Sequence, residues 1–417
     1  MKIAVIGAGI IGVTTAYELA CDGHEVTVFE RRSAAAEESS FANAGVIAPG
    51  YVTPWAAPGM PRKVLSQLWG RYAPVKIGLN LSLSELAWIG RWYRACRPET
   101  YLASRSNLLQ LAFYSRERLH HITADLQLEY DRSEGYLVLL RSEKEYKMVQ
   151  MSLQVLGDAG VPHALLDAPD TRKVEPALNP DTPFFGAVHL PNDEVGNCRQ
   201  FALMLKNAAQ QIGVTFAFNT TVASVAKTQR PSLAVAGEAQ AREFDAIVMC
   251  AGLASAQLLK PLGLKIPLAA VYGYSISAPI REALNAPRSA VMDERYKVAI
   301  SRLGQRVRVA GSAEMGGSAN VHRASSIQTL YKVLHDWFPG ATTQSSGVQI
   351  WKGARPMLPD GPPVIGTSGL PGVWLNLGHG SSGWALSCGS ARALADLVAG
   401  RSPDLDLTGF DVARLAR

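Results

Sequence analysis

Three features are scarce in this sequence: cysteine, long apolar runs and blocks of basic residues. Its 417 residues contain five cysteines, an odd number, with no C-x-x-C pair. This pattern argues against a disulfide framework and against a zinc site, so we expect no bound metal. No stretch approaches the ~18–20 consecutive apolar residues that a membrane-spanning helix needs. The net charge of +6 would suit nucleic acid, but the sequence has no Lys/Arg-rich block, so we expect no nucleic-acid partner.

The length and the first residues bear on organisation and location. With 417 residues, 47% of them hydrophobic, the chain exceeds the roughly 250–300 residues at which single cores stop growing, so we expect two domains. Lys2 and the apolar stretch after it are superficially like a signal peptide, but glycines and alanines interrupt that stretch in a fixed order and Glu18 follows. We therefore predict a structural role for the stretch and a cytoplasmic protein.

The first 30 residues have the pattern of a dinucleotide site. Residues 2–6 form a short apolar run that contains Val5, followed by Gly7-Ala8-Gly9-Ile10-Ile11-Gly12, a helical stretch, and a second strand-like run at 25–29 that ends at Glu30. The three glycines permit a tight turn, a close approach to a pyrophosphate and close helix–strand packing. The helix start can hold phosphates, and the carboxylate can accept ribose hydroxyls. Because every element occurs in order, dinucleotide binding is favoured over a chance glycine-rich turn.

These residues leave the kind of dinucleotide open. Glu30 would repel the 2′-phosphate of NADP, although Arg31 and Arg32 beside it weaken that argument. A third strand is predicted at 244–249, ending in Cys250-Ala251-Gly252. Its continuous apolar character suits a parallel strand buried on both faces, and Ala251-Gly252 suits a close turn against the nucleotide. An ordinary sheet strand is the alternative for this segment.

A second glycine-rich turn lies near the end of the chain. A strand-like run at 374–377 leads into Gly378-His379-Gly380-Ser381-Ser382-Gly383, and an amphipathic helix is predicted from there to Ala399. A flavin dinucleotide can use two helix starts, one for its pyrophosphate and one for the ring edge where negative charge develops, so this pairing favours FAD over NAD. His379 is a candidate catalytic base, with a role in backbone geometry as the alternative. Cys388 suits packing, so we expect FAD to be bound non-covalently.

Arg355 is the candidate substrate-binding residue. It precedes Pro356, which fixes the backbone, and it lies between strand-like runs at 348–350 and 364–365. A guanidinium held in this way suits bidentate binding of a carboxylate. The alternative is an arginine in a surface turn.

Several blocks together resemble a known family. They are residues 41–51 (FANAGVIAPGY), 54–59 (PWAAPG), 190–196 (LPNDEVG), 353–366 and 378–384. The sequence resembles the small subunit of the bacterial D-amino acid dehydrogenases, within the D-amino acid oxidase and glycine oxidase superfamily of FAD-dependent enzymes. Two departures, Ala354 and Ala385, stand where leucine and threonine are common.

The resemblance implies an α/β fold with two domains. A Rossmann-like FAD-binding domain of the D-amino acid oxidase type is expected at residues 1–50, 191–255 and 346–417. A second, α+β substrate domain built on a mixed sheet is expected at residues 51–190 and 256–345.

The resemblance also implies roles for individual residues. Arg355 is expected to bind the substrate carboxylate, and Tyr274 and His379 are further candidates at the catalytic site. The expected FAD-binding residues are Val5, Gly7, Ala8, Gly9, Ile10, Ile11, Gly12, Glu30, Arg31, Ser40, Asn43, Ala44, Gly45, Val222, Ala251, Gly252, Gly353, Arg355, Gly378, His379, Gly380, Ser381, Ser382 and Gly383.

The reaction implied is oxidative deamination of a D-amino acid such as D-alanine to a 2-oxo acid and ammonia, by hydride transfer from the α-carbon to flavin N5. A respiratory quinone is the implied electron acceptor, and the family's naming implies a second subunit, with self-association as the alternative. An amine oxidase or dehydrogenase for glycine, sarcosine, D-proline or hydroxyproline is the competing interpretation.

Residues 55–97 suit contact with the inner face of the cell membrane. Tryptophans alternate there with basic residues, as in membrane-surface helices; these are Trp55, Trp69, Trp88 and Trp92 with Arg62, Lys63, Arg71, Lys76, Arg91, Arg94 and Arg97. Amphipathic helices that cover the second domain are the equal alternative. Further helices are predicted at 104–126 and 143–157, and a hairpin at 296–310 around Leu303-Gly304-Gln305.

Overall fold

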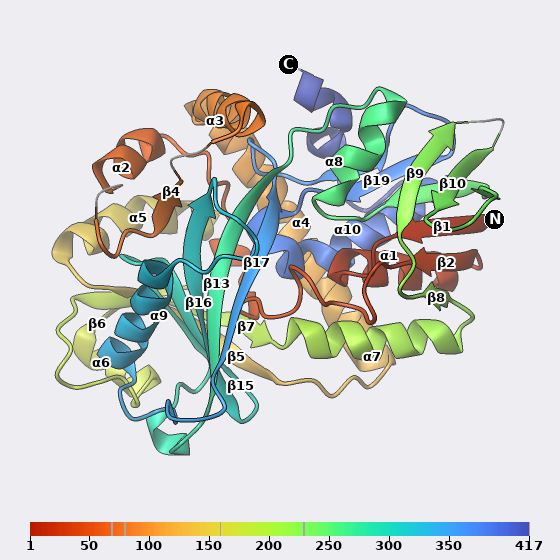
Figure 1. Ribbon diagram of the computed structural model, residues 1–417. Helices are drawn as coiled ribbons and strands as arrows, with labels where there is room; N and C mark the ends of the chain where they lie inside the picture. Colours follow the sequence, from red (N-terminus) through yellow and green to blue (C-terminus); the bar gives the residue numbers. More distant parts are fainter. Residues whose placement is uncertain (68–69, 79–80, 159, 228–229, 417) are drawn as a thin grey trace.

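Two β-sheets lie side by side in the molecule (Figure 1). The structure is a computed structural model, and it describes residues 1–67, 70–78, 81–158, 160–227 and 230–416. A six-stranded sheet with its helices forms one half, and a ten-stranded sheet forms the other. The mixed α/β fold class predicted from the sequence is therefore confirmed.

The six-stranded sheet has the order β18-β19-β12-β1-β2-β8 and is parallel except for β18. Its strands are β1 (Lys2–Ile6), β2 (Glu25–Phe29), β8 (Thr215–Ala217), β12 (Ala246–Met249), β18 (Val364–Thr367) and β19 (Val373–Leu377). The strands predicted at 2–6, 25–29 and 244–249 pair with one another in this sheet, with the first strand between the other two. The apolar residues of β1 and β12 are buried on both faces, as a parallel sheet between two layers requires.

Four helices cover one face of this sheet: α1 (Ile10–Cys21), α4 (Pro98–Asp125), α7 (Cys198–Gln211) and α10 (Gly383–Val398). The opposite face carries a small sheet, β9 (Val222–Lys227), β10 (Pro231–Val235) and β11 (Arg242–Glu243), together with α8 (Ala254–Leu259). The predicted helix at 104–126 is confirmed as part of α4, which begins earlier because Pro98 occupies its first turn. α10 matches the predicted C-terminal helix.

The ten-stranded sheet follows the path β17-β13-β16-β15-β14-β5-β7-β3, with β4 beside β16 and β6 beside β7. Its strands are β3 (Val46–Ile47), β4 (Val75–Ile77), β5 (Arg132–Leu140), β6 (Ala164–Asp167), β7 (Gly186–Gly196), β13 (Ala269–Pro279), β14 (Ala290–Asp293), β15 (Val298–Leu303), β16 (Arg306–Met315) and β17 (Gln349–Met357). β15 and β16 form the predicted hairpin. Helix α9 (Ala324–Trp337) packs on one face of the sheet over an apolar core.

The remaining helices lie around the large sheet. They are α2 (Met60–Gln67), α3 (Leu83–Ala95), α5 (Glu143–Asp158) and α6 (Ala168–Val174), with short 3₁₀ turns at Pro49–Tyr51, Lys260–Leu262, Ala283–Asn285, Gly380–Ser382, Thr408–Phe410 and Val412–Ala416. In Figure 1, α2 and α3 stand at the upper left, beside the ends of β16 and β13. α5 confirms the helix predicted at 143–157.

The structure corrects the predicted domain boundaries. The boundary at 190/191 falls inside β7, and the one at 345/346 assigns β17 to the cofactor domain, yet both strands pair within the ten-stranded sheet. Conversely, α4 lies in the range predicted for the second domain but packs on α1 and α10. Strand pairing and helix packing between distant segments set these boundaries, and local sequence carries no signal for them.

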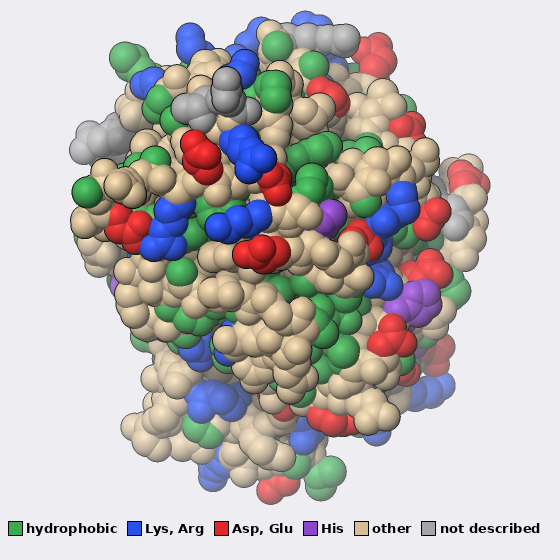
Figure 2. Space-filling view, turned by 90° about the vertical axis from the view of Figure 1, so that its right-hand side faces the viewer, with side chains coloured by type: hydrophobic (Ala, Val, Ile, Leu, Met, Phe, Trp, Pro, Cys, Tyr) green, Lys and Arg blue, Asp and Glu red, His purple; other side chains and the backbone are tan. Residues whose placement is uncertain are grey.

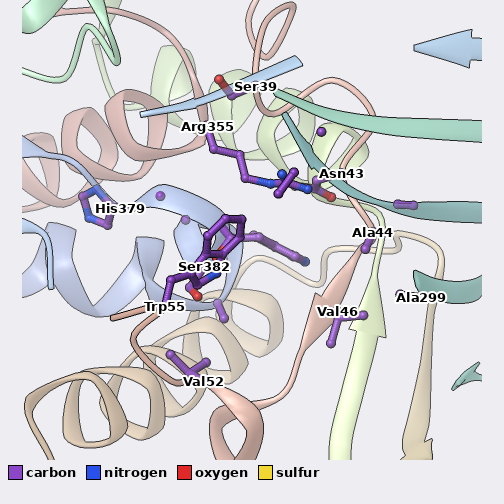
Figure 3. Close-up of a pocket in the computed structure, with 18 of the residues that line it drawn as sticks. Ser39, Asn43, Ala44, Val46, Val52, Trp55, Ala299, Arg355, His379 and Ser382 are labelled. Carbon is purple, nitrogen blue, oxygen red and sulfur yellow. The ribbon is translucent and has the colours of Figure 1, made fainter. Parts of the chain in front are cut away.

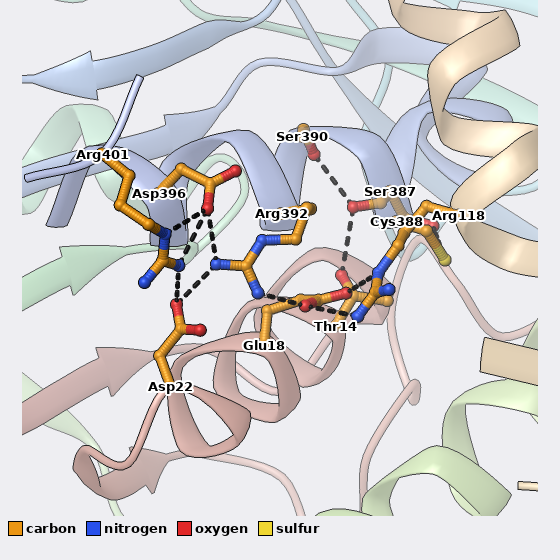
Figure 4. A network of polar contacts seen from close by, with 10 residues as sticks. All are labelled: Thr14, Glu18, Asp22, Arg118, Ser387, Cys388, Ser390, Arg392, Asp396 and Arg401. Carbon is orange, nitrogen blue, oxygen red and sulfur yellow. Dashed lines mark hydrogen bonds and ion pairs between the residues drawn. The ribbon is translucent and has the colours of Figure 1, made fainter. Parts of the chain in front are cut away.

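A buried ion network ties the cofactor-side helices together (Figure 4). The Glu18 carboxylate on α1, with 0% of its side chain exposed, accepts hydrogen bonds from Arg118 Nε of α4 at 2.6 Å and from Arg392 Nη1 of α10 at 2.8 Å. Arg392 also contacts Asp22 and Asp396. The network ties the second half of α10 to α1 and α4.

Charges are mixed on the side of the molecule that carries β8 and β9. Figure 2 shows Lys and Arg side chains interspersed with Asp and Glu over this face. The net charge of +6 is therefore not gathered into one basic patch on this face.

Candidate active site

A cavity of about 490 Å³ lies between the two sheets (Figure 3). The start of α10, the loop before β3 and one face of the large sheet all contribute to its lining. Most of the cofactor and substrate residues predicted from the sequence lie in this lining.

The turn from β1 into α1 has the geometry expected of a phosphate-binding loop. Gly7 has a φ of +101°, and a β-carbon there would come within 2.7 Å of the Cys250 carbonyl oxygen. α1 starts at Ile10 after Gly9 and has no side-chain cap, so N–H groups at its first turn are available for an anion. The Ser40 hydroxyl accepts from Ile10 N at 3.1 Å. Ala251 also lies close to this turn, since its Cα is 3.1 Å from the same β-carbon position.

Glu30 lies at the end of β2, beside this turn. Its carboxylate accepts hydrogen bonds from Ala8 N at 2.7 Å and from Arg32 N at 2.8 Å. Arg31 pairs with Glu38 instead, with Nε 2.9 Å from Oε1. Val222 begins β9 two residues after Thr220, whose N–H donates to the Glu30 carbonyl, so Val222 lies on the same nucleotide side. Val5 lies in the buried centre of β1.

The segment from Ser39 to Val46 crosses the large sheet, and nearly every residue is anchored to a different strand. Ser39 Oγ donates to the carbonyl of Ala354 on β17 at 2.5 Å. The next three anchors run the other way, from side chains of the sheet to carbonyls of the loop. They are Ser275 of β13 to Ala42 at 2.8 Å, Arg308 of β16 to Asn43 at 3.2 Å and Ser301 of β15 to Ala44 at 2.7 Å.

The last two residues complete this path. The N–H of Gly196 on β7 donates to Gly45 O at 2.8 Å, and Val46 pairs with Val195. Gly45 has a φ of +76°, and a β-carbon there would come within 2.9 Å of Gly196 O, so only glycine fits. Backbone N–H and carbonyl groups of this loop therefore border the cavity in a fixed position.

The second predicted glycine turn lies opposite, between β19 and α10. Gly378 and Gly380 both have positive φ, +81° and +57°, and α10 begins at Gly383 without a side-chain cap. The free N–H groups of this helix start border the cavity, as the sequence predicted. Asn376 is a lining residue that the sequence did not single out, and its Oδ1 has no hydrogen-bond partner among the described residues.

Arg355 extends from β17 into the cavity (Figure 3). Its Nη1 donates to the carbonyl of Ser312 at 2.9 Å, and no carboxylate of the described chain pairs with it. The guanidinium lies over Gly273, where a β-carbon would come within 2.3 Å of Nη2. Burial lowers the pKa of Arg355 to about 10, so the group stays charged at neutral pH. A partly buried cation without a counter-ion among the described residues is suited to an anionic ligand.

His379 does not suit the role of a general base. Its Nε2 lies 3.0 Å from Ser390 Oγ, within hydrogen-bond distance on α10, and burial lowers its pKa to about 3. The ring is therefore neutral, weakly basic and already bonded. The structure favours the alternative for this residue, in which the ring holds the glycine turn to the helix.

Tyr274 is also bonded elsewhere. Its ring packs in the core beneath α9, and its hydroxyl donates to Glu314 and accepts from Arg323 N at 3.1 Å. Lys352 donates to the same Glu314 carboxylate at 2.9 Å. Burial and the neighbouring carboxylate raise the pKa of Tyr274 far above its ordinary value, so the hydroxyl is neither free nor acidic.

Sequence reasoning missed the residues that line the substrate side. Trp351, Ala299 and Met292 come from three strands of the large sheet, while Val52 and Trp55 come from the segment after the 3₁₀ turn at Pro49–Tyr51. Trp55 lies in the block at 54–59, but that block gives no indication that its ring faces the cavity. For Trp351, Ala299 and Met292, only the alternation of residues along strands could have suggested it.

The residues present fit the predicted FAD. Two uncapped helix starts, each behind a glycine turn, provide backbone donors for a pyrophosphate and for the edge of a flavin ring. Asn376 leaves an amide oxygen unpaired in the same lining, and Glu30 stands at the end of β2 for a ribose.

Comparisons with known proteins agree with FAD as the cofactor. The family model described as FAD dependent oxidoreductase matches residues 2–397. The D-amino acid dehydrogenase of Rhizobium johnstonii is 40% identical over 416 residues, covering 99% of this chain and 100% of that protein. The D-amino acid dehydrogenase of Bradyrhizobium diazoefficiens is 41% identical over 418 residues, covering 100% and 99%. The glycine oxidase structure from Bacillus cereus has a TM-score of 0.73 at 20% identity, covering 96% of this chain and 95% of that one, so the overall fold is shared.

Proposed function

The chain belongs to the family of FAD dependent oxidoreductases, and from this premise we propose that it catalyses the oxidative deamination of D-amino acids to 2-oxo acids and ammonia. The observation that carries the proposal is Arg355, a partly buried guanidinium in the cofactor cavity that has no carboxylate partner among the described residues. Full-length relatives named D-amino acid dehydrogenase support the stereochemistry. We further propose that FAD is bound non-covalently, because Cys388 is buried in α10 and packs in the core.

Arg355 binds the substrate carboxylate and thereby orients the α-carbon. Two parallel N–H donors of a guanidinium match the two oxygens of a carboxylate. Since Ser312 O and the sheet hold the guanidinium, its position is set before the substrate arrives. FAD, when bound, supplies the two-electron oxidant that accepts a hydride from the α-carbon.

No side chain in the described lining is suited to remove the α-proton. The lining contains no Asp or Glu, His379 is bonded to Ser390, and Tyr274 is bonded to Glu314. The substrate amine must therefore either bind in its neutral form or lose its proton without a dedicated base. Its lone pair then assists departure of the hydride. Positioning by Arg355 and the preorganised donors of the two helix starts provide the rate enhancement. Water then hydrolyses the imine product to the 2-oxo acid and ammonia.

We propose a quinone-type compound as the electron acceptor and the membrane surface as the place where the protein meets it. None of the described helices is long and apolar enough to cross a membrane. Five large hydrophobic side chains between residues 65 and 102 are nevertheless at least half exposed; they are Leu65, Leu83, Leu86, Tyr93 and Leu102. Exposed cations stand among them at Arg62, Lys63, Arg71, Arg94 and Arg97. Apolar side chains ringed by cations suit an anionic bilayer surface.

The structure changes which residues support this contact. Trp88 is buried and its Nε1 donates to Met357 O at 3.0 Å, Trp92 packs inward, and Trp55 lines the cavity. Lys76 is buried as well. Trp69 lies outside the described residues. Leucines therefore replace the predicted tryptophans as the apolar component.

Flotation with vesicles tests the membrane contact. The protein should float with anionic phosphatidylglycerol vesicles and not with neutral phosphatidylcholine vesicles, and Leu83→Ser with Leu86→Ser should reduce flotation. A protein that stays in the soluble fraction with both vesicle types contradicts the contact. Analytical ultracentrifugation of the purified chain tests the accompanying proposal that it associates with itself or a second subunit.

An anaerobic spectrum tests the reaction. Purified protein should show flavin absorbance that D-alanine bleaches and L-alanine does not. If neither isomer bleaches the flavin band but glycine, sarcosine or D-proline does, the competing interpretation as an amine oxidase or dehydrogenase for those substrates is correct.

A further inference from the structure

The cavity continues beyond Arg355 as a channel across the large sheet, and its floor is made of small residues. Gly273 of β13, Ala310 of β16 and Ala299 of β15 face the cavity on three neighbouring strands, and Met292 of β14 ends the row. The register brings the last three together, because Ala310 pairs with Ala299, and Ala299 pairs with Met292. Gly273 stands two residues before Ser275, the β13 partner of Ala310. At the usual strand spacing, the channel floor spans roughly 14 Å.

The residues of the floor are small because the large side chains of these strands point to the other face of the sheet. Val309 and Ile300 stand next to Ala310 and Ala299 in sequence and pack in the core beneath α9. Alternation along each strand thus places valine and isoleucine on the α9 side and alanine on the cavity side. A substrate side chain can occupy the room that these small residues leave.

Two indole rings stand at the carboxylate end of the channel. Gly273 and Gly353 pair across β13 and β17. The Arg355 guanidinium lies over Gly273, and the Trp351 ring lies over Gly353, where a β-carbon would come within 1.8 Å of it. Trp55 approaches from the opposite segment, with its ring centroid 5.8 Å from Arg355 Cζ. In Figure 3 the Trp55 rings project into the centre of the cavity, near the Arg355 chain.

The charges of the lining exclude one class of side chain. The described residues around the cavity include the cations Lys63, Arg295, Lys297 and Arg355, and they include no Asp or Glu. Lys297 pairs with Glu294 and Arg295 with Glu145, so those two cations and carboxylates neutralise one another. Arg355 has no carboxylate partner among the described residues, so a lysine or arginine side chain beside it would be repelled. Val52 and Met292 provide apolar wall instead, and methionine adapts to ligands of different shape.

We infer that this channel binds the side chain of the amino acid substrate and selects apolar side chains larger than a methyl group, such as those of norleucine, methionine and phenylalanine. Trp55 is the specificity-determining residue at its start and Ala299 the one on its floor. The inference rests on the proposed D-amino acid activity and names the substrate class of that site.

Paired substrates provide the first test. D-Norleucine and D-lysine have the same carbon chain and differ in one ammonium group, so kcat/KM should favour D-norleucine by about 100-fold or more. D-Norleucine should also exceed D-alanine. Equal values for D-norleucine and D-lysine, or a preference for D-glutamate over D-norleucine, would overturn the inference.

Variants of the channel provide the second test. Ala299→Leu should lower the ratio of kcat/KM for D-norleucine over D-alanine by about tenfold, because it fills the floor, and Trp55→Ala should lower the same ratio by removing a wall. Trp55→Phe should restore part of the ratio. Ala239→Leu, at an exposed site in the loop between β10 and β11, is the matched control and should leave the ratio unchanged.

The outcomes separate this inference from the proposed function. If Ala299→Leu does not fold, Met292→Ala decides, since it lengthens the channel and should raise the ratio for D-phenylalanine over D-alanine. Ratios that stay constant in Trp55→Ala and Met292→Ala, while D-alanine still bleaches the flavin, overturn the channel and leave the proposed function intact. If no D-amino acid bleaches the flavin of the unmodified protein, the proposed function itself fails.

Discussion

Gly12 stands so close to Gly7 that a β-carbon on Gly12 would lie 1.8 Å from the Gly7 carbonyl oxygen. This contact lets α1 begin directly against the turn that follows β1. Because the turn and the helix start touch, Ile10 and Ile11 line the cavity, and the N–H of Ile10 donates to Ser40 Oγ there. The glycine motif is therefore a packing requirement as well as a conformational one.

The substitution Gly12→Ala should prevent FAD binding. The added methyl group must push α1 away from the turn, at a cost of about 1–3 kcal/mol or more, and the helix start moves with it. The measurement is the ratio of flavin to protein absorbance after purification and reconstitution with FAD. Gly90→Ala is the matched control, since Gly90 is also helical and nothing lies within 4 Å of its β-carbon position. That variant should bind FAD fully and unfold at an equal or higher temperature.

The substitution Arg355→Ala should raise KM for every substrate. Loss of a buried charged hydrogen-bonding partner costs about 2–5 kcal/mol, which corresponds to an increase of about 30-fold or more. Arg355→Lys should recover only part of the loss, because an ammonium cannot form the bidentate pair. Steady-state kinetics with D-alanine and D-norleucine measure both variants. A KM that stays the same in Arg355→Ala would remove this residue from the substrate site.

The substitution His379→Gln should leave the pH dependence of flavin reduction in place. Burial lowers the pKa of His379 to about 3, so this ring does not titrate in the range in which the substrate amine loses its proton. Stopped-flow reduction rates at a series of pH values should give the same midpoint in both proteins, with a change in the maximum rate only. A midpoint that disappears in the variant would make His379 the base.

The cofactor end of the site and the fold class could be predicted from the sequence, because both depend on local features. The glycine turns before α1 and α10 dictate their own backbone conformation, and Glu30 follows a strand that is readable from its alternation. The substrate end depends on register between distant strands. Arg355 could be predicted as a candidate because a proline follows it. Trp351 and Ala299 reach the cavity only through the pairing of β17, β13, β16 and β15. The predicted domain boundaries at 190/191 and 345/346 missed the pairing of β7 and β17 within the large sheet for the same reason.

Asp193 should make stability depend on pH in the range 4–7. Burial raises the pKa of this carboxyl on β7 to about 7, although Arg116 nearby opposes the shift. Between the unfolded pKa of about 3.9 and the folded value, the folded state keeps a proton that the unfolded state releases. This stabilisation is fully present below about pH 4 and is lost as the pH rises through 7.

Urea unfolding at pH 5 and pH 8 measures the effect. The native protein should lose up to about 3 kcal/mol from this group between pH 5 and pH 8, at 1.36 kcal/mol for each of the roughly two pH units below the folded pKa of about 7. Asp193→Asn cannot ionise and should flatten the dependence, whereas exposed Asp158→Asn should keep the native slope. If the unfolding free energy of Asp193→Asn changes with pH as steeply as that of the native protein, the dependence comes from other groups.

The substitution Glu18→Gln should destabilise the fold by about 3–5 kcal/mol. It removes a fully buried carboxylate and leaves Arg118 and Arg392 without their shared partner. Glu143→Gln is the control, because that residue forms an exposed pair with Lys147 worth about 0.3–0.5 kcal/mol. Thermal and urea unfolding of the FAD-bound protein distinguish the two. Equal stability of Glu18→Gln and the native protein would show that the network is dispensable.

Through the loop from Ser39 to Val46, the large sheet supports both the proposed flavin site and the proposed substrate site. Its anchors on β17, β13, β16, β15 and β7 mean that the loop cannot slide or tilt unless the sheet does. Arg355 is carried by the same sheet. The separation between the flavin-side loop and the guanidinium is thus set by one rigid surface, and thermal rocking of the six-stranded half against the ten-stranded half leaves that separation unchanged.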